Sequence, residues 1–156
     1  MTTTYIHYGS NNFDLQKFNP ISNQETLWNK PSGGFWASPI DAKLGWRNWC
    51  QQERYELNNL NAHFNFLITP NARVHHLYTS KDLEHLPKQS GHYISYGNFF
   101  YPDFEKMMED GWDAIELHLS SSDRNWDYED GLYWRLYGWD CDSILIMNPN
   151  IILPIA

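Results

Sequence analysis

The apolar residues of this 156-residue chain occur in short segments, and this limits the fold to short strands and helices. The longest apolar stretch, residues 144–155, is interrupted by Pro149 and Pro154 and falls short of the roughly 18 residues that a transmembrane helix needs. Elsewhere apolar and polar residues alternate, as in residues 64–68, which is typical of a half-buried strand. We therefore expect a fold that contains a sheet, and no membrane partner.

Predicted strands and helices are interspersed along the whole chain, whose length suits one domain over residues 1–156. The spacing of Trp46, Trp49 and Cys50 places two indoles on one face of a helix. Short strands with interspersed helices favour a curved α+β sheet over a doubly wound parallel one. The expected strands are residues 5–8, 35–37, 64–68, 74–78, 114–119, 143–147 and 151–155, and the expected helices are residues 39–57, 80–86 and 102–109.

The charge and the aromatic content narrow the range of partners. The formal net charge is -8, and the 11 Lys and Arg residues form no run. An acidic chain repels phosphate backbones, so strong general binding of nucleic acid is not expected. The chain also holds 8 Trp, 10 Tyr and 8 Phe. A small domain cannot bury all of these rings, so some are expected to line a cleft for a flat ligand.

Three further features argue against a disulfide framework, a secretory signal and a metal site. Cys50 and Cys141 are far apart and form no CxxC pattern, so we expect two reduced, buried thiols. The first ten residues lack the basic and apolar regions of a secretory signal, which favours a cytoplasmic protein. His75 and His76 are neighbours on an expected strand, so their rings point to opposite faces. They are not expected to share a metal ion, and no metal site is predicted.

Three separate segments carry residues that suit a nucleotide ligand. In residues 5–10, His7 ends a strand and Gly-Ser follows, where a ring nitrogen can bond a ribose hydroxyl and glycine lets a ligand approach the backbone. In residues 33–39, two glycines precede an aromatic strand that ends in Ser38. In residues 137–152, two aspartates precede a strongly apolar strand. Each segment equally fits an ordinary turn beside a core strand.

In this order, the three segments resemble the ADP-ribosyltransferase superfamily, in its small bacterial or phage form. Members often begin with a strand reading Tyr-His-Gly followed by Ser or Thr, and continue with a glycine-aromatic strand ending in Ser or Thr. They close with a strand that carries Glu and ends in Asn-Pro or Asp-Pro. The counterparts here are residues 6–10, 34–38, 112–115 and 142–152. The resemblance implies a curved, mostly antiparallel split sheet with short helices.

The resemblance also implies a set of NAD-binding residues. His7 would bind the adenosine ribose, together with its neighbours Tyr8, Gly9 and Ser10. Ser38 would bind the nicotinamide ribose. Two rings would pack against the nicotinamide, that of Trp36 and that of either Tyr93 or Tyr96.

Two departures from the family pattern concern the residues that matter most. Tyr8 separates His7 from Gly9, where the family has His directly before Gly. Counting back from the proline of the last motif, the position of the family's Glu is occupied by Ser143, with Asp142 one place earlier. A carboxylate there would stabilise an oxocarbenium-like transition state. The expected order of candidates for this role is Asp142, then Asp140, with Glu116 or Glu129 if the strand register differs.

The function expected from the resemblance is transfer of ADP-ribose from NAD to an unidentified macromolecular acceptor, a protein side chain or a nucleobase. Two alternatives are a nucleotide-binding domain without turnover, which the missing Glu favours, and a non-catalytic acidic module that masks a basic surface of another protein.

Overall fold

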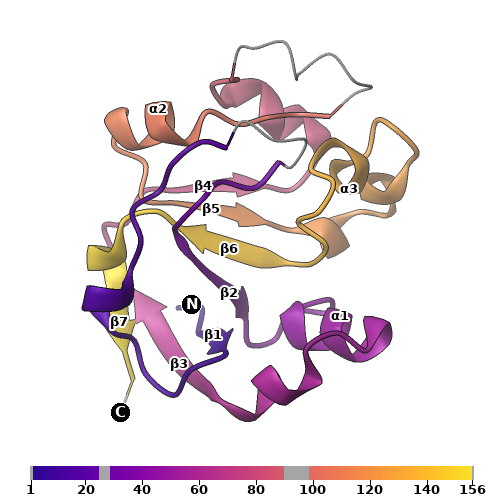
Figure 1. The fold of residues 1–156 in the computed structure, drawn as a ribbon. Helices are drawn as coiled ribbons and strands as arrows, with labels where there is room; N and C mark the ends of the chain where they lie inside the picture. The colour runs from indigo at the N-terminus through magenta and orange to yellow at the C-terminus, as the bar shows by residue number, and fades with distance from the viewer. Residues whose placement is uncertain (1, 25–28, 90–98, 156) are drawn as a thin grey trace.

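The computed structural model describes residues 2–24, 29–89 and 99–155, which form one mixed α+β arrangement with a seven-stranded sheet (Figure 1). The strand order is β4-β5-β6-β2-β1-β3-β7. The strands are β1 (Tyr5–Tyr8), β2 (Phe35–Pro39), β3 (His63–Ile68), β4 (Val74–Leu77), β5 (Ala114–Leu117), β6 (Ser143–Ile146) and β7 (Ile152–Pro154). The α-helices are α1 (Trp46–Glu53), α2 (Phe104–Glu109) and α3 (Leu132–Arg135).

Short 3-10 helices complete the described structure. They are η1 (Leu15–Lys17), η2 (Leu57–Asn61), η3 (Ser80–His85), η5 (Leu119–Ser121), η6 (Asp123–Trp126) and η7 (Pro149–Ile151). Among the described residues, no helix has the length and apolar character that crossing a bilayer requires. The sequence prediction of an α+β fold with short helices is therefore confirmed at this level.

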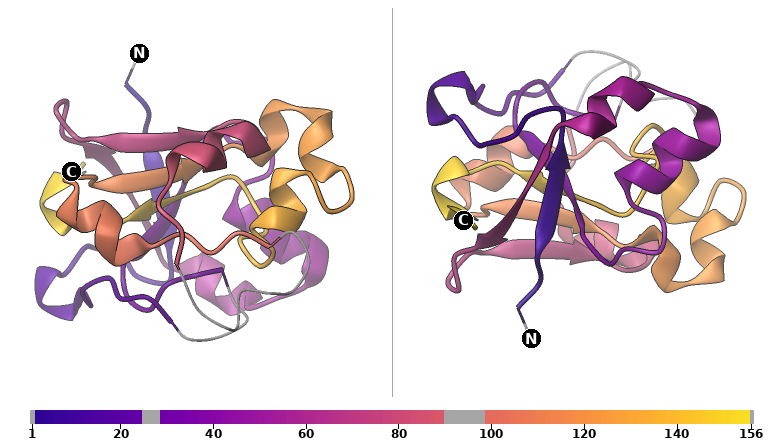
Figure 2. Two further views of the ribbon diagram at one scale, coloured as in Figure 1. Left: turned by 90° about the horizontal axis from the view of Figure 1, so that it is seen from above. Right: turned by 90° about the horizontal axis from the view of Figure 1, so that it is seen from below.

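Strand β2 joins two groups of strands. Its first residues pair with β6, with Trp36 opposite Leu145, while its last residues pair with β1, with Ser38 opposite Ile6. Because β2 changes partner along its length, β4, β5 and β6 form one group and β1, β3 and β7 form the other (Figure 1). The described pairings are antiparallel apart from that of β4 with β5. Seen from below, β1 and β3 lie next to α1 (Figure 2).

The helix predicted over residues 39–57 is much shorter in the structure. Turns and irregular residues occupy positions 40–45, and α1 begins at Trp46 after Gly45, whose N–H donates to the Asn48 side chain at 3.0 Å. The helix ends at Arg54, which has a left-handed backbone with φ of 53°. The periodic tryptophans therefore marked the helix correctly, while its ends depended on backbone geometry that periodicity does not encode.

The sheet separates two hydrophobic cores because successive side chains of a strand point to opposite faces. Leu145 of β6 packs into the first core, with Trp139 and Phe104. Ile144 and Ile146 pack into the second core. These three β6 residues are 0% exposed, and each such side chain contributes about 1.5–3 kcal/mol of hydrophobic stabilisation. Strand β6 therefore contributes to both cores, as does β5, with Ile115 in the first and Ala114 in the second.

We predict that Gly33→Ala is strongly destabilising, because Gly33 has a φ of +73° and a Cβ there would lie 2.2 Å from the backbone oxygen of Pro20. Backbone strain at such a φ is about 1–2 kcal/mol, and displacing Pro20 should bring the total loss to about 3 kcal/mol or more. The measurement is chemical denaturation. Gly9→Ala is the control, since Gly9 has a φ of +109° but no heavy atom within 4 Å. Equal losses in the two variants would show that close approach is not the constraint at Gly33.

Candidate functional site

Residues from the separate sequence motifs meet at one cavity of about 250 Å³, which we call the first cavity. Its lining residues come from β1, β2 and the start of β6, from α1 and η2, and from the segment before β6. Aromatic rings and a few polar groups line it together, as in many small-molecule sites. The lining residues are Ile6, His7, Tyr8, Lys30, Trp36, Ala37, Ser38, Trp46, Glu56, Asn59, Trp139, Cys141 and Ser143.

A second cavity of about 700 Å³ adjoins the first. The two share four lining residues, Ile6, Tyr8, Ser38 and Trp46. The second cavity adds polar side chains, among them the exposed Arg47. We refer to the two cavities together as the groove. The groove thus combines the aromatic side chains of the first cavity with the charged side chain of Arg47 in the second.

The rings of the first cavity are held in place by one another. Trp36 packs edge-on against Trp139, with ring centroids 5.0 Å apart, and Trp46 stacks on Trp49 at 5.2 Å. The ammonium group of Lys30 lies 5.4 Å from the centroid of Trp36, within the range of a cation–π contact. Such a wall of fixed rings suits a flat ligand, because little side-chain entropy is lost on binding.

The side chains of Tyr8 and Ser38 lie on one face of the sheet, whereas His7, which also lines the first cavity, stacks its ring on Phe35. Ile6 is paired with Ser38, and strand alternation places Tyr8 on the same face as Ile6. Tyr8 accordingly lines both cavities. It directly precedes Gly9, the position at which the family pattern has its histidine. Tyr8 and His7 are thus both part of the lining of the first cavity.

The ring of His7 is engaged elsewhere in the sheet. It stacks on Phe35 with centroids 4.1 Å apart, and its Nδ1 lies 2.6 Å from the carbonyl oxygen of Trp36. The contact fits an Nδ1–H that donates to this oxygen. Burial lowers the pKa of His7, against a smaller opposing effect of the bond to Trp36. His7 also lines a separate cavity of about 240 Å³, together with Ser10.

The hydroxyl of Ser38 connects three segments. It donates to the carbonyl oxygen of Asp142 at 2.8 Å and accepts the backbone N–H of Trp46 at 3.0 Å. Ser38 lines the first cavity, and its hydroxyl already bonds the residue before β6 and the first turn of α1. It retains one lone pair for a ligand.

Asp142, the first candidate for the catalytic acid, does not line the first cavity, although its neighbours Cys141 and Ser143 do. Its buried carboxylate accepts the N–H of Ser120 at 3.0 Å, the hydroxyl of Ser120, and the N–H of Leu44 at 3.4 Å. The carboxylate thus joins two loops. This geometry matches the turn interpretation that the sequence left open.

Asp140, the second candidate, lies outside the cavity lining but close to Lys30, which belongs to it. Burial raises the pKa of Asp140, and the negative charge of Glu53 raises this pKa further. The positive charge of Lys30 partly offsets the rise. Asp140 also has a left-handed backbone, with φ of 69°. Asp and Asn tolerate this conformation better than other non-glycine residues, which explains the residue type without a catalytic role.

Glu116, the third candidate, lies on the other face of the sheet. It is paired with Ile144, whose side chain belongs to the second core, so the two point away from the groove. Its carboxylate accepts the hydroxyl of Tyr5 and lies 2.9 Å from Nε2 of His118. Burial alone would raise the pKa of Glu116, but the bonds from His118 and Tyr5 outweigh burial and lower it. Glu116 therefore belongs to a different site from Tyr8 and Ser38.

Other predicted residues contribute less or lie outside the structure. Gly9 has a φ of +109° and donates its N–H to Ala62, and Ser10 donates its hydroxyl to Asn12. Glu129 is exposed, with φ of 67°. Tyr93 and Tyr96 lie outside the described residues.

Several cavity residues were not predicted from the sequence. Trp46 was marked by its helical spacing, but nothing in the pattern placed that face against β1 and β2. Lys30, Glu56 and Asn59 come from irregular or 3-10 segments with no motif. Among the described residues that line the first cavity, Glu56 alone carries a carboxylate.

The chain matches no protein-family model, no curated protein and no solved structure. Function must therefore be inferred from the side chains that the fold brings together. Those side chains form an aromatic groove on one face of the sheet, and a cluster around Glu116 on the other face.

We predict that Asp142→Ala lowers the free energy of unfolding by about 2–3 kcal/mol, because the donors of Ser120 and Leu44 lose a buried charged acceptor. Chemical denaturation measures the loss. Asp41→Ala is the control, since Asp41 is exposed in the turn before α1. An Asp142→Ala variant as stable as the control would rule out this bridging role.

We also predict a pH-dependent gain in stability from Asp140→Asn. The raised pKa of Asp140 means that the folded state favours the protonated form. Its favourable contribution is complete below the ordinary pKa of about 4 and is lost as the carboxyl ionises at higher pH. Asparagine does not ionise, so the stability of the variant relative to the wild type should increase between pH 4 and 7. Asp41→Asn is the control, and a difference that stays constant with pH would contradict the prediction.

Proposed function

We propose that this protein binds NAD in the groove and belongs functionally to the ADP-ribosyltransferases. The observation that carries the proposal is that Tyr8, Trp36, Ser38 and Ser143 line one cavity. These residues come from the three segments whose order and composition resemble that superfamily. The observed seven-stranded α+β sheet with short helices is compatible with this assignment, and an ADP-ribosyltransferase-like fold is part of the proposal.

The size and lining of the groove support the nicotinamide riboside half of NAD as the occupant of the first cavity. A cavity of about 250 Å³ accommodates one ring and one sugar better than a whole dinucleotide. Trp36 and Trp46 offer apolar rings to the nicotinamide, while Asn59 offers hydrogen bonds to the ribose. The second cavity then receives the pyrophosphate and adenosine, with Arg47 as the cation for the phosphates.

In the proposed reaction, the bond between the nicotinamide nitrogen and the ribose C1′ breaks, and its electron pair leaves with nicotinamide. The nucleophile of the acceptor forms the new bond to C1′ and gives its proton to water. A carboxylate near C1′ stabilises the positive charge of the transition state. We assign this role to Glu56, which lines the cavity and whose carboxylate is already oriented by the amide of Asn59 at 3.1 Å. The acceptor is a protein side chain or a nucleobase.

A second candidate function is binding of NAD without turnover. The specific observation in its favour is Ser143, which lines the cavity at the position where the resembled family has its glutamate. A serine hydroxyl cannot carry the negative charge that this role requires. Nicotinamide release therefore separates the two candidates, whereas binding of NAD is common to both.

We predict that NAD binds with a dissociation constant below about 1 mM, equivalent to about 4 kcal/mol, as measured by isothermal titration calorimetry. Tyr8→Ala should weaken binding about tenfold, because a ring between the two cavities is lost. Tyr128→Ala is the matched control, since Tyr128 is 72% exposed and lines neither cavity. Absence of binding heat at millimolar NAD would overturn the proposal. Equal affinities of the two variants would overturn the assignment of the groove.

The same proteins test the reaction through release of nicotinamide from labelled NAD, with water and cell lysate as acceptors. Glu56→Gln should bind NAD as the wild type does and release nicotinamide about a hundredfold more slowly, because one positioned charge is lost. Full activity of Glu56→Gln would reject Glu56 as the acid. A wild type that binds NAD and releases no nicotinamide would reject transfer and leave the second candidate.

A further inference from the structure

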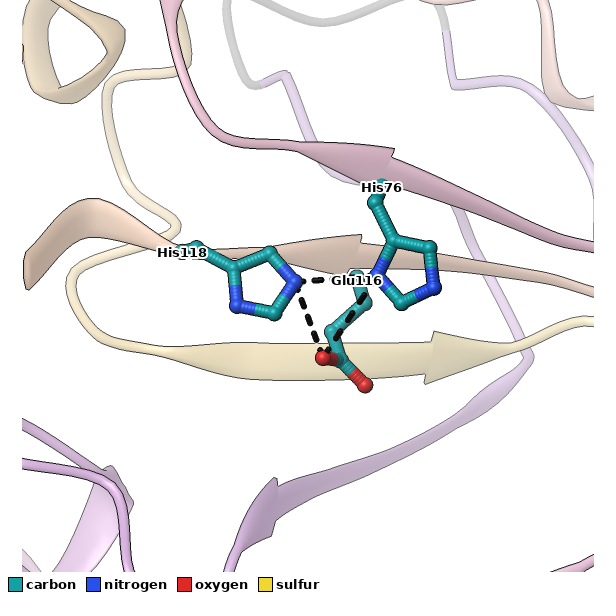
Figure 3. A group of neighbouring side chains, drawn as sticks. All are labelled: His76, Glu116 and His118. Atoms are coloured by element: carbon teal, nitrogen blue, oxygen red, sulfur yellow. Dashed lines mark hydrogen bonds and ion pairs between the residues drawn. The ribbon is translucent and has the colours of Figure 1, made fainter. Parts of the chain in front are cut away.

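Two histidines and a glutamate converge on the face of the sheet opposite to the groove (Figure 3). Nδ1 of His76 lies 3.0 Å from Nε2 of His118, and the same Nε2 lies 2.9 Å from Oε2 of Glu116. Nδ1 of His76 is 3.7 Å from that oxygen. Three atoms with lone pairs, each able to coordinate a metal ion, therefore surround one point.

The fold creates this cluster from two segments that are distant in the sequence. Strands β4 and β5 are parallel, and their register places His76 beside Glu116. His118 follows Glu116 by two residues, so strand alternation brings its ring to the same face. His75 points to the opposite face, where its ring packs edge-on against Trp112 at 5.1 Å. The rings of the two adjacent histidines thus lie on opposite faces of β4, and His76 contacts Glu116 of β5 and His118, which follows it.

The separations fit a tetrahedral site. With metal–ligand bonds of about 2.0–2.1 Å, two ligand atoms of a tetrahedron lie about 3.3 Å apart. The three observed separations, 2.9, 3.0 and 3.7 Å, lie on both sides of this value. Two imidazoles and one carboxylate are a donor set that zinc accepts, with the fourth position left for water or another ligand.

Residues around the cluster hold the three side chains in place. The hydroxyl of Tyr5 donates to Oε1 of Glu116, which leaves Oε2 for the histidines. The ring of Tyr78 stacks on His118 with centroids 4.3 Å apart, and on His76 at 5.7 Å. Such partners of the ligands are typical of metal sites, because they fix ligand orientation before the ion binds.

Burial and access also suit a bound cation. The Glu116 side chain is 4% exposed, and its ion-pair partners within the described residues are these two histidines. A buried carboxylate is costly unless a positive charge lies beside it. The side chains of His76 and His118 are 40% and 23% exposed, so an ion can reach the cluster from solvent. A cavity of about 350 Å³, lined by Tyr5 and His76 among others, adjoins it.

We propose that His76, Glu116 and His118 bind a divalent zinc ion with three protein ligands and an open fourth position. The alternative explanation is a hydrogen-bonded His-Glu-His network that binds no metal. Both explanations account for the contacts. Only the zinc site predicts that each chain takes up one zinc ion. The site lies on the other face of the sheet from the groove and does not depend on the proposed binding of NAD.

The test is a zinc titration of protein that was purified without a histidine tag and treated with a chelator. We expect one zinc ion to bind per chain with a dissociation constant below about 1 µM, which is equivalent to about 8 kcal/mol. Competition with a chromophoric chelator measures this constant. Zinc should raise the melting temperature of the wild type through mass action. Cobalt should give the visible absorption of a four-coordinate site.

Matched variants separate a specific site from adventitious binding. His76→Gln should weaken zinc binding at least a hundredfold, because it removes a ligand. Loss of a residue that only supports a ligand weakens metal binding about 10- to 100-fold. Tyr5→Phe should weaken it about tenfold, because the orienting bond to Glu116 is lost. His75→Gln is the control and should bind zinc as the wild type does. No stoichiometric uptake, or equal affinities of His76→Gln and His75→Gln, would overturn the proposal.

Discussion

The change of partner along β2 is the constraint on which the rest of the structure depends. Phe35 to Ala37 pair with β6, and the residues that follow pair with β1, so a single five-residue strand joins both groups of the sheet. The buried hydroxyl of Ser38 lies at this change of partner and bonds both Asp142 and the first turn of α1. It thereby ties the start of β6 and the helix to β2. The groove exists because these three segments are kept together at this point.

The sheet also separates two kinds of chemistry. Its groove face presents tryptophans, a tyrosine and small polar groups, which suit a flat ligand with a sugar. Its other face presents two imidazoles and a carboxylate, which suit a cation. Because a strand sends successive side chains to opposite faces, Glu116 cannot reach a ligand that Tyr8 contacts. Two candidate sites therefore coexist in a small domain without competing for residues.

The carboxylates show how similar residues acquire different roles from their surroundings. Asp142 is surrounded by backbone and hydroxyl donors, so its charge stabilises the junction of two loops. Asp140 occupies a left-handed backbone position where its charge is partly desolvated. Glu56 has no sequence motif, yet η2 places it at the cavity with Asn59 beside it. In the proposed transfer, we therefore assign the acid by its position in the cavity and not by its closeness to the family pattern in the sequence.

The sequence by itself determined the α+β character, the short elements, most strand positions and three of the segments that meet at the first cavity, because hydrophobic periodicity and turn residues act locally. It also separated His75 from His76, since alternation is a property of any strand. Only the tertiary structure decided that Tyr8 lines both cavities, that Asp142 faces two loops, and that His76 meets Glu116. These outcomes depend on strand register and on pairings between residues far apart in the chain, and no local pattern encodes either.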